Sequence, residues 1–161
     1  MTILTRMTGT SLVAVLHAND SAFALSEHDR AQPRCFTFVP RRIDATNVMR
    51  MLLDAMAGDA DKLRSVHVVE GGAADHFTNC AKLALVALAG ACGASLWSIP
   101  FLKARIVADR ADCTTAGQVA IALELERRRR KANGERLGEL VLASDMKTEM
   151  RDLRQHIQAS A

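Results

Sequence analysis

The chain has 161 residues, 49% hydrophobic and 24% charged, which is the composition of a folded globular protein and excludes a disordered one. Its net charge of +3 permits a polyanionic partner but does not require one, and an aromatic content of 4% argues against a platform of stacked bases. A chain of this length predicts a single domain over residues 1–161, and the alternation of extended and helical segments predicts that it is an α/β domain.

Three short apolar segments near the amino terminus predict an antiparallel meander. The segments are Leu12–His17, Ala22–Ser26 and Cys35–Val39, with polar residues between them. Pro40 ends the third segment because proline has no N–H to donate to a strand partner. Residues 1–10 precede the meander, hold no apolar run long enough for a signal peptide, and are expected to be flexible.

Helical and extended patterns alternate after the meander. Asp44 can cap a first helix. Its apolar face consists of Val48, Met51, Leu52, Ala55 and Met56. Ser65–Val69 then predicts a buried strand, and Asp75 can cap a second helix that runs through Ala89 or a little further. Ala104–Ala108 is expected to be the next strand.

The carboxy-terminal third predicts two more helices. Thr115 and Gln118 have the spacing of a capping box in front of a helix over Val119–Lys131. Leu137–Ala143 fits a strand or a short helix, and residues 144–161 form an amphipathic pattern. Together the elements predict a mixed sheet, led by an antiparallel three-stranded meander and continued by βα units, with helices packed on the sheet.

The stretch Leu83–Leu102 holds no charged residue and reaches the length of a membrane span. Gly90, Gly93 and Pro100 interrupt it, so we expect a buried helix followed by a turn, and no membrane segment.

The cysteines lie in or beside apolar runs and form no C-x-x-C pair, which favours reduced thiols and a cytoplasmic location. They are Cys35, Cys80, Cys92 and Cys113.

The expected order, three antiparallel strands followed by βα units, resembles the ribonuclease-H-like superfamily over about residues 11–132. That superfamily includes Holliday-junction resolvases and many noncatalytic or ATP-binding relatives. For a catalytic member the resemblance implies carboxylates from the first strand, the end of the fourth strand and a late helix, which together hold two divalent metals. Glu70 matches the second position, and Asp112 or Glu124 approximates the third. The first strand has no acid, and Asp20 lies in the turn after it, so no metal cofactor is expected.

Two smaller motifs are each interpreted as structural. Glu70-Gly71-Gly72-Ala73 precedes a helix, as phosphate-binding loops do, but it matches neither standard glycine pattern, so a simple turn is expected. His76 and Cys80 are four residues apart and can share a helix face. The apolar surroundings of Cys80 favour a structural thiol over a nucleophile.

The strongest local charge feature is a run of five cations, which we call the basic run. It consists of Arg127, Arg128, Arg129, Arg130 and Lys131. Glu124 and Glu126 precede it at the spacing of helical ion pairs, which favours a solvated helix end. Contact with a nucleic-acid backbone or an acidic partner protein is the alternative role for these five residues.

From these patterns we predict a noncatalytic binding and assembly protein. It would self-associate as a homo-oligomer through its apolar helices and contact an acidic protein or nucleic acid through the basic run. The alternative is a divergent metal-dependent nuclease of the ribonuclease-H-like type. Its carboxylates would be Asp20, Glu70 and either Asp112 or Glu124, and its cofactor Mg²⁺ or Mn²⁺.

Overall fold

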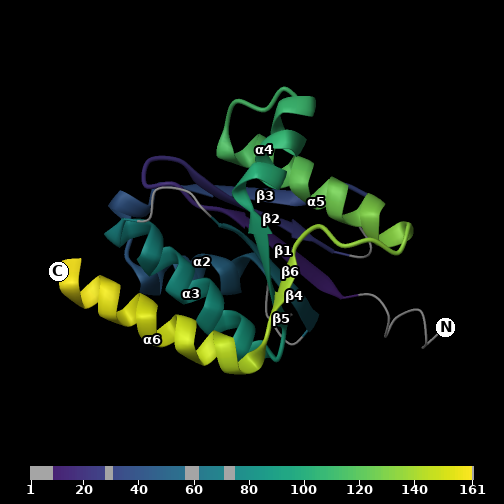
Figure 1. Cartoon of the computed structure of the whole chain (residues 1–161). Coiled ribbons are helices and arrows are strands. Elements are labelled where there is room, and N and C mark those ends of the chain that lie inside the picture. The colour runs from purple at the N-terminus through teal and green to yellow at the C-terminus, as the bar shows by residue number, and fades with distance from the viewer. Residues whose placement is uncertain (1–8, 28–30, 57–61, 71–74, 161) are drawn as a thin grey trace.

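A computed structural model describes residues 9–27, 31–56, 62–70 and 75–160, and in them six strands form one mixed sheet (Figure 1). The strands are β1 (Thr10–Val15), β2 (Ser21–Ser26), β3 (Arg34–Phe38), β4 (Leu63–Glu70), β5 (Ser95–Pro100) and β6 (Glu139–Val141). They lie in the order β3-β2-β1-β4-β5-β6. The β1–β2 and β2–β3 pairs are antiparallel, β1, β4 and β5 are parallel, and β6 returns antiparallel to β5. The predicted meander and mixed sheet are confirmed.

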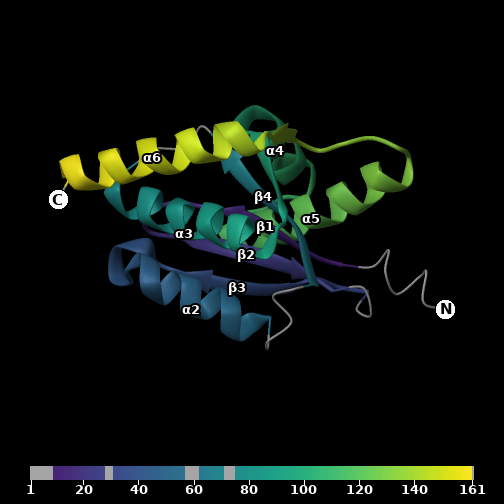
Figure 2. The same cartoon turned by 90° about the horizontal axis from the view of Figure 1, so that it is seen from below.

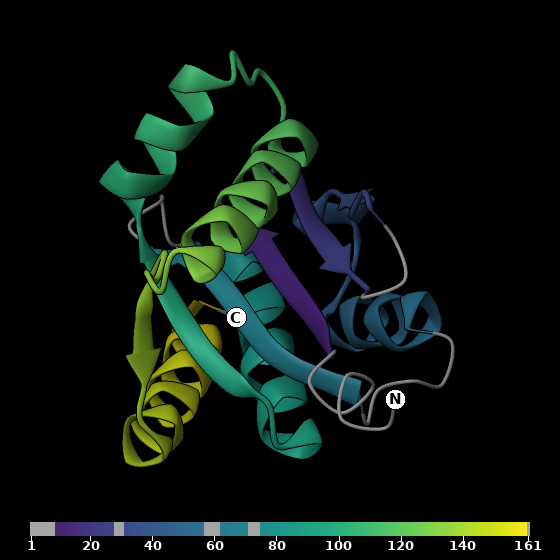
Figure 3. The same ribbon diagram turned by 90° about the vertical axis from the view of Figure 1, so that its right-hand side faces the viewer.

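Helices cover both faces of this sheet. They are the short 3₁₀ helix η1 (Pro40–Arg42), α2 (Ala45–Ala55), α3 (His76–Cys92), α4 (Phe101–Arg110), α5 (Ala116–Ala132) and α6 (Ala143–Ser160). Helices α2, α3 and α6 lie on one face, with α6 running alongside α3 (Figure 2). Helices α4 and α5 lie on the other face, where α5 crosses β1 and β2 (Figure 3). The sheet is therefore the middle layer of three.

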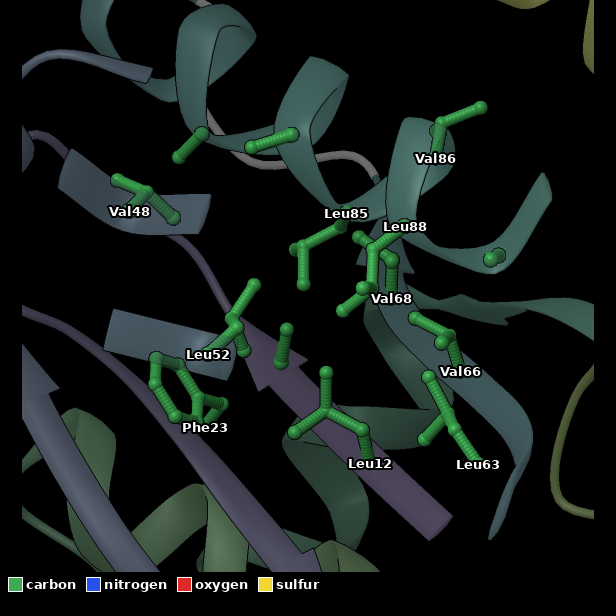
Figure 4. Close-up of a cluster of buried hydrophobic side chains, with 14 of the residues drawn as sticks. Leu12, Phe23, Val48, Leu52, Leu63, Val66, Val68, Leu85, Val86 and Leu88 are labelled. Atoms are coloured by element: carbon green, nitrogen blue, oxygen red, sulfur yellow. The ribbon is translucent and has the colours of Figure 1, made fainter. Parts of the chain in front are cut away.

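The alternation of side chains along the strands divides the core between the two faces. Leu12 of β1 points to the face covered by α2 and α3, whereas Val13 points to the face covered by α4 and α5. The larger cluster gathers Phe23 from β2, Leu52 from α2 and Leu85 from α3 (Figure 4). All of these side chains are almost fully buried. The apolar face predicted for the first helix is thus the one that α2 turns to the sheet.

Three helix starts are capped as their sequences predict. The side chain of Asp44 accepts from the N–H of Asn47 at 2.9 Å. Asp75 and Thr115 each form a complete capping box with the residue three positions later. Because a cap satisfies backbone N–H groups that have no partner inside the helix, a short polar motif sets where each helix begins.

The prediction of a strand over Ala104–Ala108 is wrong, because these residues belong to α4. Ala104 and Val107, one helical turn apart, are the buried residues of this helix. The strand lies earlier, as β5, because Gly93 adopts a left-handed φ of 66° and ends α3. The N–H of Ala94 bonds to the carbonyl of Ala89 at 2.9 Å, which closes the helix end.

The uncharged stretch is therefore divided among α3, β5 and the start of α4. Within the part of the chain that the structure describes, no helix is both long enough and apolar enough to cross a bilayer. Leu137–Ala143, for which the sequence predicted either a strand or a short helix, contains β6 and the first residue of α6. Gly138 is required beside β5, since a Cβ there would lie 2.5 Å from the carbonyl oxygen of Ser98.

Candidate functional site

Two carboxylates from distant parts of the sequence meet on one ammonium group. Glu70 is the last residue of β4, Lys82 lies on α3 and Glu149 lies on α6. The Nζ of Lys82 is 2.7 Å from Oε1 of Glu70 and 2.5 Å from Oε1 of Glu149. We call these three residues the Lys82 cluster. The side chains of Lys82, Glu70 and Glu149 are 18%, 35% and 24% exposed, so solvent reaches all three.

The charge of Lys82 is maintained by its two partners. Burial by itself lowers the pKa of this ammonium, but hydrogen bonds from it to Glu149 and Glu70 outweigh burial and raise the pKa above its ordinary value. Lys82 is therefore charged at neutral pH, and the cluster carries one net negative charge. A cation is thus already held between these carboxylates by a side chain of the protein.

The other predicted acids do not join Glu70. Asp20 accepts from the N–H of Ala116 at 3.0 Å and so helps to fasten the start of α5. Asp112 sits in the turn before α5 with a positive φ of 52°. Glu124 is completely buried on α5, on the opposite face of the sheet from α3. Among the described residues, no three His, Cys, Asp or Glu side chains gather to hold a metal ion.

Sequence reasoning missed Glu149, the acid that does approach Glu70. The resemblance placed the late-helix acid at Asp112 or Glu124, whereas the structure brings Glu149 of α6 against α3. Glu149 is next to Met150, which packs against the larger core cluster together with Met146. The apolar face of this helix is evident in the sequence. An acid beside that face could have been chosen as a candidate, but its contact with α3 depends on tertiary packing.

The donor set offers two carboxylates, both engaged by the Lys82 ammonium, which is too few for a centre of two divalent cations. Mg²⁺ is commonly held by one or two protein carboxylates, with water and substrate phosphate completing its octahedron. Glu70 and Glu149 supply two carboxylates, and the Lys82 ammonium stands in for a cation between them. A two-metal centre needs further oxygen ligands, and β1, with the sequence TSLVAV, offers no carboxylate.

The basic run is divided among several local partners. Arg127 makes hydrogen bonds of 2.5–3.1 Å with the buried Glu124. Arg128 bonds to Ser26 Oγ and to the carbonyl of Ala31. Arg129 and Arg130 both pair with Glu126. The arginines of the run therefore form ion pairs within α5 and hydrogen bonds to the meander. Contact of the run with nucleic acid or an acidic protein stays a prediction.

The thiol–imidazole pair lacks the features of an activated nucleophile. Cys80 Sγ lies 3.8 Å from Nε2 of His76. Burial, assisted by the negative charges of Asp44 and Asp75, raises the pKa of the Cys80 thiol. The protonated form is thus favoured, as for a structural thiol.

No disulfide joins the four cysteines, all of which lie in the described ranges. The glycines of the motif after Glu70 lie outside those ranges.

A polar cavity of about 420 Å³ lies on the face of the sheet covered by α5. We call it the His67 cavity. Its lining includes Ser11 of β1, Ser65 and His67 of β4, Trp97 of β5, Arg127 of α5 and Arg136. His67 is 6% exposed, and its ring stacks on Trp97 with centroids 5.8 Å apart. Burial and the charge of Arg127 lower the pKa of His67 to about 3, although a hydrogen bond with the Leu12 backbone by itself raises this pKa.

Acid is expected to destabilise the fold through His67. Between its folded pKa of about 3 and an unfolded value of about 6.5, the unfolded chain binds a proton that the folded chain does not. The stability is therefore complete above about pH 6.5 and falls as the pH decreases toward 3. Urea unfolding should show a loss between about pH 7 and about pH 5 that is about 2 kcal/mol larger in the parent than in His67→Gln. Equal losses in the two proteins would contradict the conclusion that His67 causes the loss of stability in acid.

No protein-family model matches the sequence, and no curated protein matches it either. Solved structures do share its architecture. RuvC of Thermus thermophilus, in complex with a Holliday junction substrate, superposes with a TM-score of 0.50 at 10% identity, over 94% of this chain and 94% of that one. An uncharacterized Pseudomonas aeruginosa protein with similarity to the peptidase YeaZ gives 0.50 at 21% identity over 64% of this chain and 47% of its own. The chain thus spans about half the length of that protein.

These likenesses establish the fold. The chain has the ribonuclease-H-like fold, as the order of its elements predicted. They also contradict the prediction of a noncatalytic binding and assembly protein. The matching structures are RuvC in complex with its substrate and a protein with similarity to a peptidase. The homo-oligomer and the cytoplasmic location stay predictions.

Proposed function

We propose that the chain is a divergent nuclease of the ribonuclease-H-like type that cleaves branched nucleic acid at the Lys82 cluster. The observation that carries the proposal is the meeting of Glu70 and Glu149 on one cation at the end of β4. The RuvC likeness over nearly the whole of both chains supports it, since that protein takes a Holliday junction as its substrate. Branched DNA is therefore the first substrate to test.

The charge of the cluster predicts that cleavage requires a divalent cation. Two carboxylates and one ammonium carry a net charge of minus one, which repels a phosphodiester. A bound Mg²⁺ or Mn²⁺ would supply positive charge at the scissile phosphate. Glu70 and Glu149 would hold that cation through their carboxylate oxygens, and Lys82 would keep its proton on Nζ and add to the attraction for the phosphate. The ammonium therefore also competes with the cation for the two carboxylates.

Cleavage of a labelled four-way DNA junction in Mg²⁺, in Mn²⁺ and in chelator tests this proposal. The parent should cut only with a divalent cation, and Glu70→Gln and Glu149→Gln should each lower the rate by at least about 100-fold, because several kcal/mol of charge stabilisation depend on the cation. Lys82→Met should bind Mn²⁺ more tightly in a calorimetric titration, since a competing charge is removed.

Glu126→Gln is the matched control. Glu126 is also a carboxylate that pairs with two cations, but it lies on α5, remote from α3 and α6. Its substitution should leave cleavage unchanged. A parent protein that cuts neither junction, duplex nor single-stranded DNA with either metal would overturn the proposal. Full cleavage by Glu70→Gln prepared in the same way would overturn it too, because the activity would then come from elsewhere.

A further inference from the structure

The His67 cavity is separate from the Lys82 cluster. Along β4, Ser65 and His67 point to the α5 face, whereas Val66, Val68 and Glu70 alternate with them and point to the α3 face. The cavity also lies toward the amino ends of the parallel strands, whereas Glu70 ends its strand. A ligand of this cavity would therefore not be a substrate of the Lys82 cluster.

The wall of this cavity contains a buried polar atom without a hydrogen-bond partner. Among the described residues, the buried side-chain nitrogens and oxygens without a hydrogen-bond partner are Nδ1 of His67 and Nδ1 of His76. His67 is more than nine-tenths buried and lines the cavity. Buried polar atoms in folded proteins nearly always have a partner. The neutral ring offers an N–H or a lone pair at Nδ1, according to its tautomer.

Other hydrogen-bonding groups on the sheet side of the cavity already have partners. The Oγ atoms of Ser11 and Ser65 lie 2.9 Å apart. The indole N–H of Trp97 donates to Ser95 Oγ at 3.0 Å, and that hydroxyl donates to the Arg64 carbonyl. His67 is thus the group on this wall whose hydrogen bonding remains to be completed.

The cavity is strongly cationic at its rim. Arg64, Arg127, Lys131 and Arg136 line it, and one acid, Glu135, lines it with them. Arg127 is oriented by Glu124, and the guanidinium of Arg136 lies 5.2 Å from the centre of the Trp97 ring. Oriented guanidinium groups match the oxygens of phosphate groups in both charge and geometry.

We infer that the His67 cavity binds a small anion carrying a phosphate group. Hydrogen phosphate and its monoesters offer charged oxygens to the arginines and the lysine that line the cavity. The volume of about 420 Å³ exceeds that of phosphate alone and leaves room for an organic group. His67 and Arg136 both lie against the Trp97 ring.

Isothermal titration of the full chain at constant ionic strength tests the inference, with inorganic phosphate and a nucleoside monophosphate as probes. Both should bind saturably, and tighter binding of the monophosphate would identify a monoester as the physiological form. The double variant Lys131→Ala/Arg136→Ala should bind at least about tenfold more weakly, the equivalent of one charged hydrogen bond. During the titration, the ¹⁵N resonance of Nδ1 of His67 should shift.

Arg105→Ala/Arg110→Ala is the control that matches the lost charge. Both arginines are exposed on α4 and lie outside the cavity. This variant should bind both probes as the parent does. Absence of saturable binding by the parent, or equal weakening in the control, would overturn the inference. Glu70→Gln should bind like the parent, so the result is independent of the proposed nuclease activity.

Discussion

Replacing Glu124 with leucine is expected to lower the free energy of unfolding by about 3 kcal/mol, a large fraction of the stability of a single domain. The carboxylate of Glu124 is fully buried and accepts several hydrogen bonds from Arg127. It also lies 3.6 Å from the guanidinium of Arg128. Its removal leaves the largely buried Arg127 charge without a partner, and such a charge costs far more than the ion pair contributes. Urea denaturation measures the loss.

Glu126→Leu is the matched control for this prediction. Glu126 occupies the same helix and pairs with Arg129 and Arg130, but Arg129 remains mostly in solvent. Its loss should change the stability by about 1 kcal/mol or less. The double variant Glu124→Leu/Arg127→Leu should recover most of the stability, because apolar residues often replace a buried ion pair at little cost. A double variant as unstable as Glu124→Leu would show that another property of Glu124 is responsible.

Truncating Phe23 to alanine is expected to destabilise the fold by about 3–5 kcal/mol. Phe23 is 1% exposed at the centre of the larger core cluster, and its ring lies against Phe36 and Phe38 at centroid distances of 5.4 and 5.8 Å. The substitution removes apolar contact and leaves a cavity between the meander and α2, which the fixed strand pairing prevents from closing. The midpoint of urea unfolding should fall accordingly.

Phe101→Ala provides the comparison for Phe23. Phe101 begins α4 and is 43% exposed, so the same chemical change should alter the stability by about 0.5 kcal/mol. Equal losses at the two positions would contradict the burial on which the prediction for Phe23 rests.

Local signals predicted most of the architecture, and the failures have identifiable causes. The caps at Asp44, Asp75 and Thr115 and the short apolar segments of the first three strands were predictable because they depend on residues within a few positions. The strand expected over Ala104–Ala108 failed because a short apolar run fits a helix as well as a strand. Gly93 was the signal that α3 ends and β5 begins.

The candidate site was only partly predictable. Glu70 was identified because the end of a strand is a local feature. Glu149 was missed, and Glu124 pairs with Arg127 and not with Glu70, because the partners of both acids are decided by which helix packs on which face. The same holds for His67, which alternates with valines in the sequence and gave no indication of a cavity.

The amino-acid sequence by itself determined the starts of α2, α3 and α5, the apolar face of α2 and the three-stranded meander, since these follow from interactions between near neighbours in the chain. Only the tertiary structure decided that α6 lies against α3 and α5 across the opposite face. That arrangement places Glu149 on the ammonium that Glu70 holds, and Arg127 beside His67. Electrostatic and hydrogen-bonding contacts act over a few ångströms, so residues tens of positions apart form a site only after the layers have packed.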